Sequence, residues 1–213
     1  VNHDAHDHIA EVSERGVKAF IVEREVELAE GSGAVVVENS LVALQALATH
    51  HRKQFNGKVV AITGSNGKTT VKEWIAQCAP SEIKIFRSPR SYNSQLGVAL
   101  SLLMLDNSYD VAIIEAGISQ RGEMERLRAM IEPDMVIFTS IGDAHAQGFA
   151  SAEEKISEKL LLAQSATTII YHSAYSALAE AIESQYCNRT LIDAAAYEVA
   201  QMGDKASQHN GEV

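Results

Sequence analysis

A short run of glycine, lysine and threonine residues carries the clearest chemical signal in the chain. Residues 59–70 are Val-Val-Ala-Ile-Thr-Gly-Ser-Asn-Gly-Lys-Thr-Thr. Strand-forming residues, a glycine-rich turn and Gly-Lys-Thr-Thr are typical of a strand, a phosphate-binding loop and a helix start. Backbone N–H groups of such a loop turn toward phosphate oxygens, Lys68 adds positive charge, and Thr69 offers a hydroxyl to Mg²⁺. We therefore predict a nucleoside triphosphate site.

The loop departs from the general pattern G-x-x-x-x-G-K-T/S at its first position. That pattern requires glycine where this chain has Ile62, and the glycine present is Gly64. The alternative is a Gly-Asn turn that only happens to precede a lysine. The phosphate loop is favoured because strand, turn and helix signals follow in the required order.

Two further residues stand at predicted strand ends, where ligands bind in parallel sheets. Glu115 ends the strand predicted over 110–115. A buried carboxylate is costly without a cation, so Mg²⁺ between Glu115, Thr69 and the triphosphate would stabilise it. The alternative is an exposed glutamate. His145 follows the strand predicted over 135–140, and it either ligates a metal, contacts phosphate or is structural.

Lys159 lies in a predicted helix beside three leucines. A helical lysine is usually a solvated surface residue. A lysine whose pKa is lowered by its surroundings can instead take up CO₂ as an anionic carbamate. The residues alone leave both alternatives open.

The N-terminal segment is rich in histidine and aspartate, namely His3, Asp4, His6, Asp7 and His8. The spacing fits no defined metal site. We expect a polar loop that precedes a helix.

Alternating strands and helices predict an α/β fold with a parallel sheet covered on both faces. The strands are predicted at 58–63, 83–87, 110–115, 135–140, 167–172 and 189–193. The helices are predicted at 68–78, 94–105, 120–131, 151–165 and 174–185.

A domain boundary is predicted at Asn56-Gly57, which breaks the chain. Before it, strands are expected at 17–22 and 34–37, and a helix from an N-cap at Ser40 to about Gln54. Residues 1–55 are too few for a robust core, so we expect the end part of an N-terminal domain. Residues 56–213 form the predicted nucleotide-binding domain.

Composition limits the kinds of partner that we expect for this chain. The formal net charge of −10 argues against nucleic acid as partner. Neither a signal peptide nor an apolar run that could span a membrane is evident, and Cys78 and Cys187 are predicted to be free thiols. These features favour a cytoplasmic protein.

The motifs together resemble the ATP-dependent Mur ligases of bacterial cell-wall synthesis. Residues 63–70 fit the family loop T-G-T/S-N/D-G-K-T/S-T/S throughout, so the early glycine is absent in the family form too. Residues 114–124 look like the segment E-x-G…G-E-I/M, and 141–149 resemble A-H-x-x-G-F. Residues 4–9 more loosely resemble D-G-H-D/N-F/Y-I/L, from which Ala5 and His8 depart.

These segments are most similar to the family member that adds D-alanyl-D-alanine. Residues 88–97 look like the form of that ligase that is fused to an alanine racemase. The commoner pattern N-x-N-N-x-I/L-G has two adjacent asparagines. Here Asn93 is kept and Ser94 replaces the second, which leaves the role of position 94 open.

The resemblance implies a role for each matching residue. It implies that the loop and its neighbour bind ATP through Gly64, Ser65, Asn66, Gly67, Lys68, Thr69, Thr70 and Asn93. It implies catalytic roles for Lys68, His145 and Lys159. One Mg²⁺ would be held by Thr69 and Glu115, and a second by His145 and a carbamylated Lys159, with Lys155 as the reserve choice for the carbamate.

The implied reaction is amide ligation of UDP-N-acetylmuramoyl-tripeptide with D-alanyl-D-alanine through an acyl phosphate. Alternatives are another Mur-type ligase or a folylpolyglutamate synthetase, which share the loop. A P-loop kinase or GTPase is disfavoured by Ile62 and by the lack of N-K-x-D. Because the family's third domain is expected to lie beyond Val213, this chain could also be a nucleotide-binding fragment without turnover.

Overall fold

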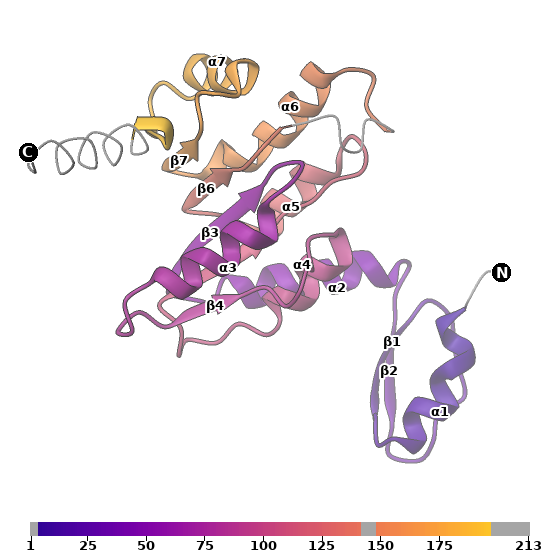
Figure 1. Cartoon of the computed structure of the whole chain (residues 1–213). Coiled ribbons are helices and arrows are strands. Elements are labelled where there is room, and N and C mark those ends of the chain that lie inside the picture. The colour runs from indigo at the N-terminus through magenta and orange to yellow at the C-terminus, as the bar shows by residue number, and fades with distance from the viewer. Residues whose placement is uncertain (1–3, 142–147, 197–213) are drawn as a thin grey trace, which may run out of the picture. The chain divides into compact units, whose positions relative to one another are not determined.

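The structure is a computed structural model that describes residues 4–141 and 148–196 of the chain (Figure 1). It divides into two compact units, Val1–Leu47 and Ala48–Val213. The division falls within helix α2 (Ser40–Arg52), before the boundary predicted at 56. Each unit is described by itself below.

The second unit contains a sheet of six parallel strands in the order β4-β5-β3-β6-β7-β8. This confirms the predicted α/β fold with a parallel sheet. The strands are β3 (Lys58–Thr63), β4 (Ile85–Arg87), β5 (Val111–Glu115), β6 (Met135–Phe138), β7 (Thr168–Tyr171) and β8 (Thr190–Asp193). Central strands are apolar and covered on both faces, as expected for a parallel sheet. Ala61 and Ile62 of β3 and Ile113 and Ile114 of β5 have no solvent exposure.

The helices lie close to their predicted positions. They are α3 (Lys68–Cys78), α4 (Gln95–Leu102), α5 (Glu123–Ile131), α6 (Ala152–Leu160) and α7 (Ser176–Gln185). The helix predicted over 151–165 changes at Leu161–Ser165 into the 3₁₀ helix η2. The helix predicted over 120–131 starts later, because the Glu123 carboxylate accepts hydrogen bonds from the amides of Ser119 and Gln120.

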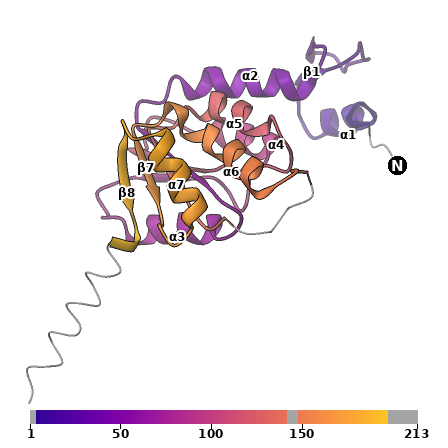
Figure 2. The same cartoon turned by 90° about the horizontal axis from the view of Figure 1, so that it is seen from above.

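The strand order places β3 at a reversal point of the sheet. The chain runs from β3 to the edge strand β4, returns to β5 beside β3, and continues to β6 on the other side of β3. Right-handed crossovers then put α3 on one face and the later helices on the other, and Figure 2 shows α3 opposite α4 and α5. Ligands of open α/β sheets bind at the carboxyl end of such a reversal point. The segment after β3 is the phosphate loop.

The first unit holds a short helical segment and a two-stranded parallel sheet. It begins with the 3₁₀ helix η1 (Ala5–His8) and α1 (Ile9–Glu14), followed by β1 (Ala19–Val22) and β2 (Gly33–Val36). The predicted N-cap of α2 is wrong by one residue. Asn39 Oδ1 accepts from the Val42 amide at 2.9 Å, whereas Ser40 donates through its amide and hydroxyl to Glu23.

The polar N-terminal segment forms η1 rather than an irregular loop, and it precedes α1 as expected. Asp4 Oδ1 lies 2.6 Å from His6 Nδ1, and the Glu23 amide donates to His6 Nε2 at 3.0 Å. Both ring nitrogens of His6 are thus engaged within the unit. His3 lies outside the described residues. Within 4–141 and 148–196, no three His, Cys, Asp or Glu side chains are grouped so that they could hold a metal ion.

None of the helices that the structure describes is long and apolar enough to cross a membrane. Cys78 and Cys187 are both exposed free thiols, as predicted.

The buried sheet predicts a large effect of truncating a central side chain. Ile113→Ala should lower the free energy of unfolding by about 2–5 kcal/mol, because it removes apolar contacts and leaves a cavity. Urea unfolding followed by circular dichroism measures this. Ile83→Ala, at a side chain that is 42% exposed, is the control and should change stability by less than about 0.5 kcal/mol. Equal losses in both variants would contradict the assignment of β5 to the core.

Candidate nucleotide and metal site

Gly64 makes the sharp turn from β3 into the phosphate loop. Its φ of +149° and Gly67's φ of +82° favour glycine, and Gly67 is the N-cap of α3. A Cβ built on Gly64 would lie 1.9 Å from Thr139 Oγ1 and 3.0 Å from the carbonyl oxygen of Ser140. The loop therefore has no room for a side chain at this position.

The end of β6 supports the loop from the side. The Ser65 amide donates to the Ser140 carbonyl at 2.6 Å, and the Asn66 amide donates to Ser140 Oγ at 3.3 Å. Thr139 Oγ1 donates to the Asn66 carbonyl at 2.6 Å. Two loop amides thus hold the loop against β6. The N–H groups of the first turn of α3 have no partner within the helix, so they are the candidate donors to a phosphate.

Two lysines from distant parts of the chain converge on one carbonyl oxygen of the loop. Lys68 Nζ donates to the Gly64 carbonyl at 2.9 Å, and Lys159 Nζ from α6 donates to the same oxygen at 3.3 Å. Lys159 is 3% exposed and Lys155, one turn earlier, is 5% exposed. Lys159 is therefore buried beside the phosphate loop and is not a solvated surface lysine.

Burial and mutual repulsion change the ionisation of these lysines. Burial, with the charges of Lys68 and Lys155, lowers the pKa of Lys159 to about 7. Burial also lowers the pKa of Lys68, while Glu115 opposes this shift. A large fraction of Lys159 therefore carries a neutral, nucleophilic amine at neutral pH.

The lysines border a cavity of about 220 Å³ at the carboxyl ends of β3 and β5. Its lining includes Gly64, Ser65, Lys68, Asn93, Lys155 and Lys159, together with residues of the 117–123 segment. Lys68 and Lys155, with the protonated fraction of Lys159, make this cavity attractive to an anion.

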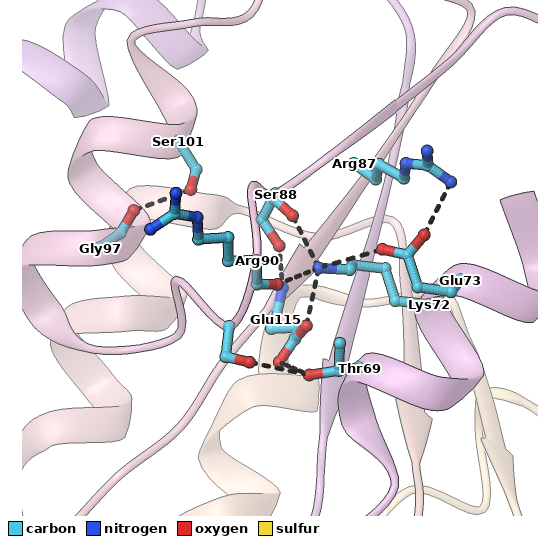
Figure 3. Close-up of polar contacts among 10 residues, drawn as sticks. Thr69, Lys72, Glu73, Arg87, Ser88, Arg90, Gly97, Ser101 and Glu115 are labelled. Carbon is cyan, nitrogen blue, oxygen red and sulfur yellow. Dashed lines mark hydrogen bonds and ion pairs between the residues drawn. The ribbon is translucent and has the colours of Figure 1, made fainter.

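The Thr69 hydroxyl and the Glu115 carboxylate lie next to each other (Figure 3). Glu115 has no solvent exposure, and its Oε2 accepts from Thr69 Oγ1 at 3.1 Å. Its Oε1 lies 2.8 Å from Lys72 Nζ, yet it has no well-directed hydrogen bond among the described residues. A carboxylate with spare acceptor capacity beside a threonine hydroxyl fits Mg²⁺, which is usually held by one or two carboxylates, waters and substrate phosphates.

The segments after β4 and β5 are fastened to each other beside the cavity. The Gly117 amide donates to the Asn93 carbonyl at 2.8 Å, and Ser94 Oγ accepts from the Gly97 amide at 3.2 Å as the N-cap of α4. Ser94 therefore has a structural role that the sequence left open. The Glu158 carboxylate accepts from the Gly122 amide at 2.8 Å and so ties α6 to the start of α5.

The structure brings most of the predicted site together. Gly64, Ser65, Lys68, Asn93 and Lys159 line the cavity, and Thr69 and Glu115 are hydrogen-bonded beside it. Asn66, Gly67 and Thr70 belong to the same loop and to the first turn of α3. His145 lies outside the described residues, so its predicted role stays a prediction.

Lys72 is the main residue of this region for which the sequence predicted no role. It follows Thr69 by three positions on α3, a spacing that places both on one helix face, and it is fully buried. That spacing was the available signal. Thr139 and Ser140 carried a weaker signal, since they follow the strand next to β3.

A phosphate loop at the reversal point of a parallel sheet, beside a lysine-lined cavity, defines a P-loop α/β domain. The family model "Mur ligase middle domain" matches residues 62–211. The chain belongs to the Mur ligase family, which removes the kinase and GTPase alternatives.

Curated relatives point to one branch of the family. The chain is 33% identical over 153 residues to the UDP-N-acetylmuramoyl-tripeptide–D-alanyl-D-alanine ligase of Rickettsia prowazekii (strain Madrid E), a match that covers 72% of this chain and 34% of that protein. It is 31% identical over 158 residues to the ligase of the same name from Bacillus subtilis (strain 168), covering 74% and 35%. The chain thus spans about a third of the length of these relatives.

Several solved structures that resemble this chain belong to the same branch of the family. MurF from Acinetobacter baumannii has a TM-score of 0.79 at 27% identity, covering 90% of this chain and 42% of that one. MurF ligase from Thermotoga maritima in complex with ADP has a TM-score of 0.77 at 26% identity, covering 87% and 43%. A folylpolyglutamate synthetase mutant from L. casei has a TM-score of 0.55 at 13% identity and shares the fold alone.

Gly64→Ala should abolish nucleotide binding, because its Cβ would overlap Thr139 and force the loop away from β6. Titration calorimetry with ADP measures this. Gly122→Ala is the matched control, since Gly122 also has a φ of +82° at a helix start but has open space around it. That control should lose about 1–2 kcal/mol of stability and keep its ADP affinity. Normal ADP binding by Gly64→Ala would contradict this steric account.

Lys159 should make stability depend on pH. Between pH 7 and 10.5 the unfolded chain binds a proton at this lysine that the folded chain has mostly released. The free energy of unfolding should therefore rise with pH across that window. Relative to Lys159→Met, the unsubstituted chain should gain stability as the pH is raised, as measured by urea unfolding in CO₂-free buffer. Exposed Lys84→Met is the control, and its free energy of unfolding should change with pH as that of the unsubstituted chain does. If the pH profile of Lys159→Met also ran parallel to that of the unsubstituted chain, this would contradict the buried state of Lys159.

Proposed function

We propose that the chain is the ATP-binding part of an ATP-dependent amide ligase that joins D-alanyl-D-alanine to UDP-N-acetylmuramoyl-tripeptide in peptidoglycan precursor synthesis. The observation that carries this proposal is the convergence of Lys68 and Lys159 on the Gly64 carbonyl, beside the Thr69–Glu115 pair. The names of the relatives with 31–33% identity supply the substrates.

ATP would bind with its phosphates on the loop. The first-turn amides of α3 and the Lys68 ammonium face the phosphates in this proposal, and Asn93 lies toward the acceptor substrate. Thr69 and Glu115 would hold one Mg²⁺, which neutralises phosphate charge when it is bound. The similarity to a MurF ligase from Thermotoga maritima that was solved in complex with ADP supports nucleotide binding.

The reaction would run in two steps. The terminal carboxylate of the tripeptide attacks the γ-phosphorus of ATP, and ADP leaves as the acyl phosphate forms. The amine of D-alanyl-D-alanine then attacks the acyl carbon, loses a proton, and phosphate leaves. Negative charge gathers in both steps, so the chain's main contribution is to orient the phosphates and to stabilise this charge with lysines.

Lys159 is proposed to act as a carbamate. Its neutral amine would attack CO₂ and lose one proton, which leaves an anionic carbamate where the neutral amine was. Its 3% exposure, its position on the cavity and its pKa of about 7 support this change. Together with His145, the carbamate would hold a second Mg²⁺.

The proposal also includes the domains on either side of the nucleotide-binding part. Residues 1–55 would belong to a domain that binds the UDP-linked substrate, and a third domain would complete the nucleotide site. Free thiols at Cys78 and Cys187 are consistent with a cytoplasmic location. Fusion to an alanine racemase stays a prediction.

Substitution of the two lysines separates binding from chemistry. Lys68→Ala should abolish ATP binding, measured by calorimetry, because the loop loses its phosphate-facing charge. In the full-length enzyme, Lys159→Ala should keep ATP binding within a few-fold but form no acyl phosphate, since buried catalytic charges typically contribute 10²–10³-fold or more. Normal turnover by Lys159→Ala would refute the carbamate role.

Phosphate release by the full-length protein tests the reaction itself. With ATP and UDP-N-acetylmuramoyl-tripeptide, phosphate should appear with D-alanyl-D-alanine and not with D-glutamate or L-amino acids. Release with D-glutamate instead would identify a sister Mur ligase. ATP binding by this chain without phosphate release, alongside an active full-length protein, would identify the chain as a nucleotide-binding unit without turnover.

A further inference from the structure

Lys72 is a fully buried cation that the proposed reaction does not use. It lies on α3, one helical turn after Thr69, and points toward the segment after β4 (Figure 3). Its side chain has 0% exposure. Burying an ammonium group is costly unless its protons find hydrogen-bond or ionic partners. The partners of Lys72 therefore indicate its role.

Three acceptors from two different segments surround the ammonium group. It donates to the Ser88 carbonyl at 2.7 Å and to the Arg90 carbonyl, and it lies 2.8 Å from Glu115 Oε1. Glu73 is a more distant neighbour at 3.6 Å, and its other oxygen is paired with Arg87 at 2.7 Å. Two hydrogen bonds of Lys72 therefore join α3 to the Ser88–Arg90 turn, and its ion pair with Glu115 joins α3 to the end of β5.

The first consequence concerns the Glu115 carboxylate. Lys72 engages Oε1, while Oε2 accepts from Thr69 Oγ1. The Glu115 amide is also held, since it donates to Ser88 Oγ at 3.3 Å. Lys72 thus fixes the rotation of the carboxylate so that one oxygen stays beside the Thr69 hydroxyl.

The second consequence concerns the segment that carries Asn93 to the cavity. Arg90 has a φ of +49°, which is uncommon for a residue with a side chain, and its carbonyl faces Lys72. A few residues later, the Asn93 carbonyl accepts from the Gly117 amide at 2.8 Å. The 88–93 segment is therefore held by Lys72 at one end and by Gly117 at the other.

We propose that Lys72 is a positioning residue that sets both the Glu115 carboxylate for Mg²⁺ and the 88–93 segment for the acceptor side of the cavity. The part that concerns Mg²⁺ rests on the proposed function. The part that concerns the 88–93 segment does not depend on any ligand. The two parts are therefore tested by different measurements.

The Mg²⁺ part is tested by calorimetry with ATP, with Mg²⁺ and with EDTA. Outer partners of a metal ligand typically contribute 10- to 100-fold to metal affinity. In Lys72→Met, the gain in ATP affinity that Mg²⁺ provides should therefore fall by about 10-fold or more, while affinity in EDTA stays within about threefold. Exposed Lys84→Met is the matched control and should keep the full gain. An unchanged or larger Mg²⁺ effect in Lys72→Met would overturn this part.

The second part is tested by amide hydrogen exchange of the ligand-free chain. Lys72→Met should speed exchange in peptides from 88–93 and at Gly117, because the tether to α3 is lost, and should leave β6–β8 unchanged. Unchanged exchange in 88–93 would overturn it. If the full-length protein binds no ATP, the proposed function fails, whereas this exchange result still decides the role of Lys72.

A double variant separates the loss of the Lys72 contacts from a general loss of stability. Lys72→Met leaves the Glu115 charge buried without its ammonium partner, so the midpoint of thermal unfolding should fall by about 10 °C. Adding Glu115→Gln removes that charge and should restore most of the midpoint. The double variant should still exchange quickly in 88–93. Slow exchange there would show that Lys72 does not hold the segment and would overturn the proposal.

Discussion

A glutamate carboxylate without solvent exposure at the end of β5 is the constraint on which the site depends. Glu115 meets the Lys72 ammonium at 2.8 Å and the Thr69 hydroxyl at 3.1 Å. A buried charge is tolerated only when it is paired, so α3 must approach β5 closely. That approach fixes where the phosphate loop, which leads into α3, lies relative to the sheet.

The sheet supports the loop from its other side. Gly64 fits against Thr139 because it has no side chain, and Ser140 accepts from the Ser65 amide at 2.6 Å. The loop is therefore held between β5 and β6, the two strands that flank β3. A rigid loop keeps its amides in place before a ligand arrives, which reduces the cost of binding.

Positive charge is concentrated where this framework leaves room. Lys68, Lys155 and Lys159 border one cavity, and their burial and repulsion bring the pKa of Lys159 to about 7. The chain belongs to the Mur ligase family, and the positive charge at this cavity favours an anionic ligand. Electrostatic preorganisation of this kind needs few reactive side chains.

The sequence by itself determined the parallel sheet, the phosphate loop and the identities of Lys68, Thr69 and Glu115 as site candidates, whereas Lys159 became a candidate only through the family resemblance. Such features depend on local order, in which strand, turn and helix signals follow one another along the chain. Helix ends were less predictable, as the Asn39 cap of α2 and the late start of α5 show, because single side-chain hydrogen bonds decide them.

Only the tertiary structure decided the partners that come from distant segments. Lys72 looked like an ordinary helical lysine until the Ser88–Arg90 turn and Glu115 were placed around it. Lys159 stayed open between surface and site until α6 packed beside the Gly64 carbonyl. The physical reason is that burial and ion pairing depend on which strands become neighbours, and the order of strands in the sheet differs from their order in the chain.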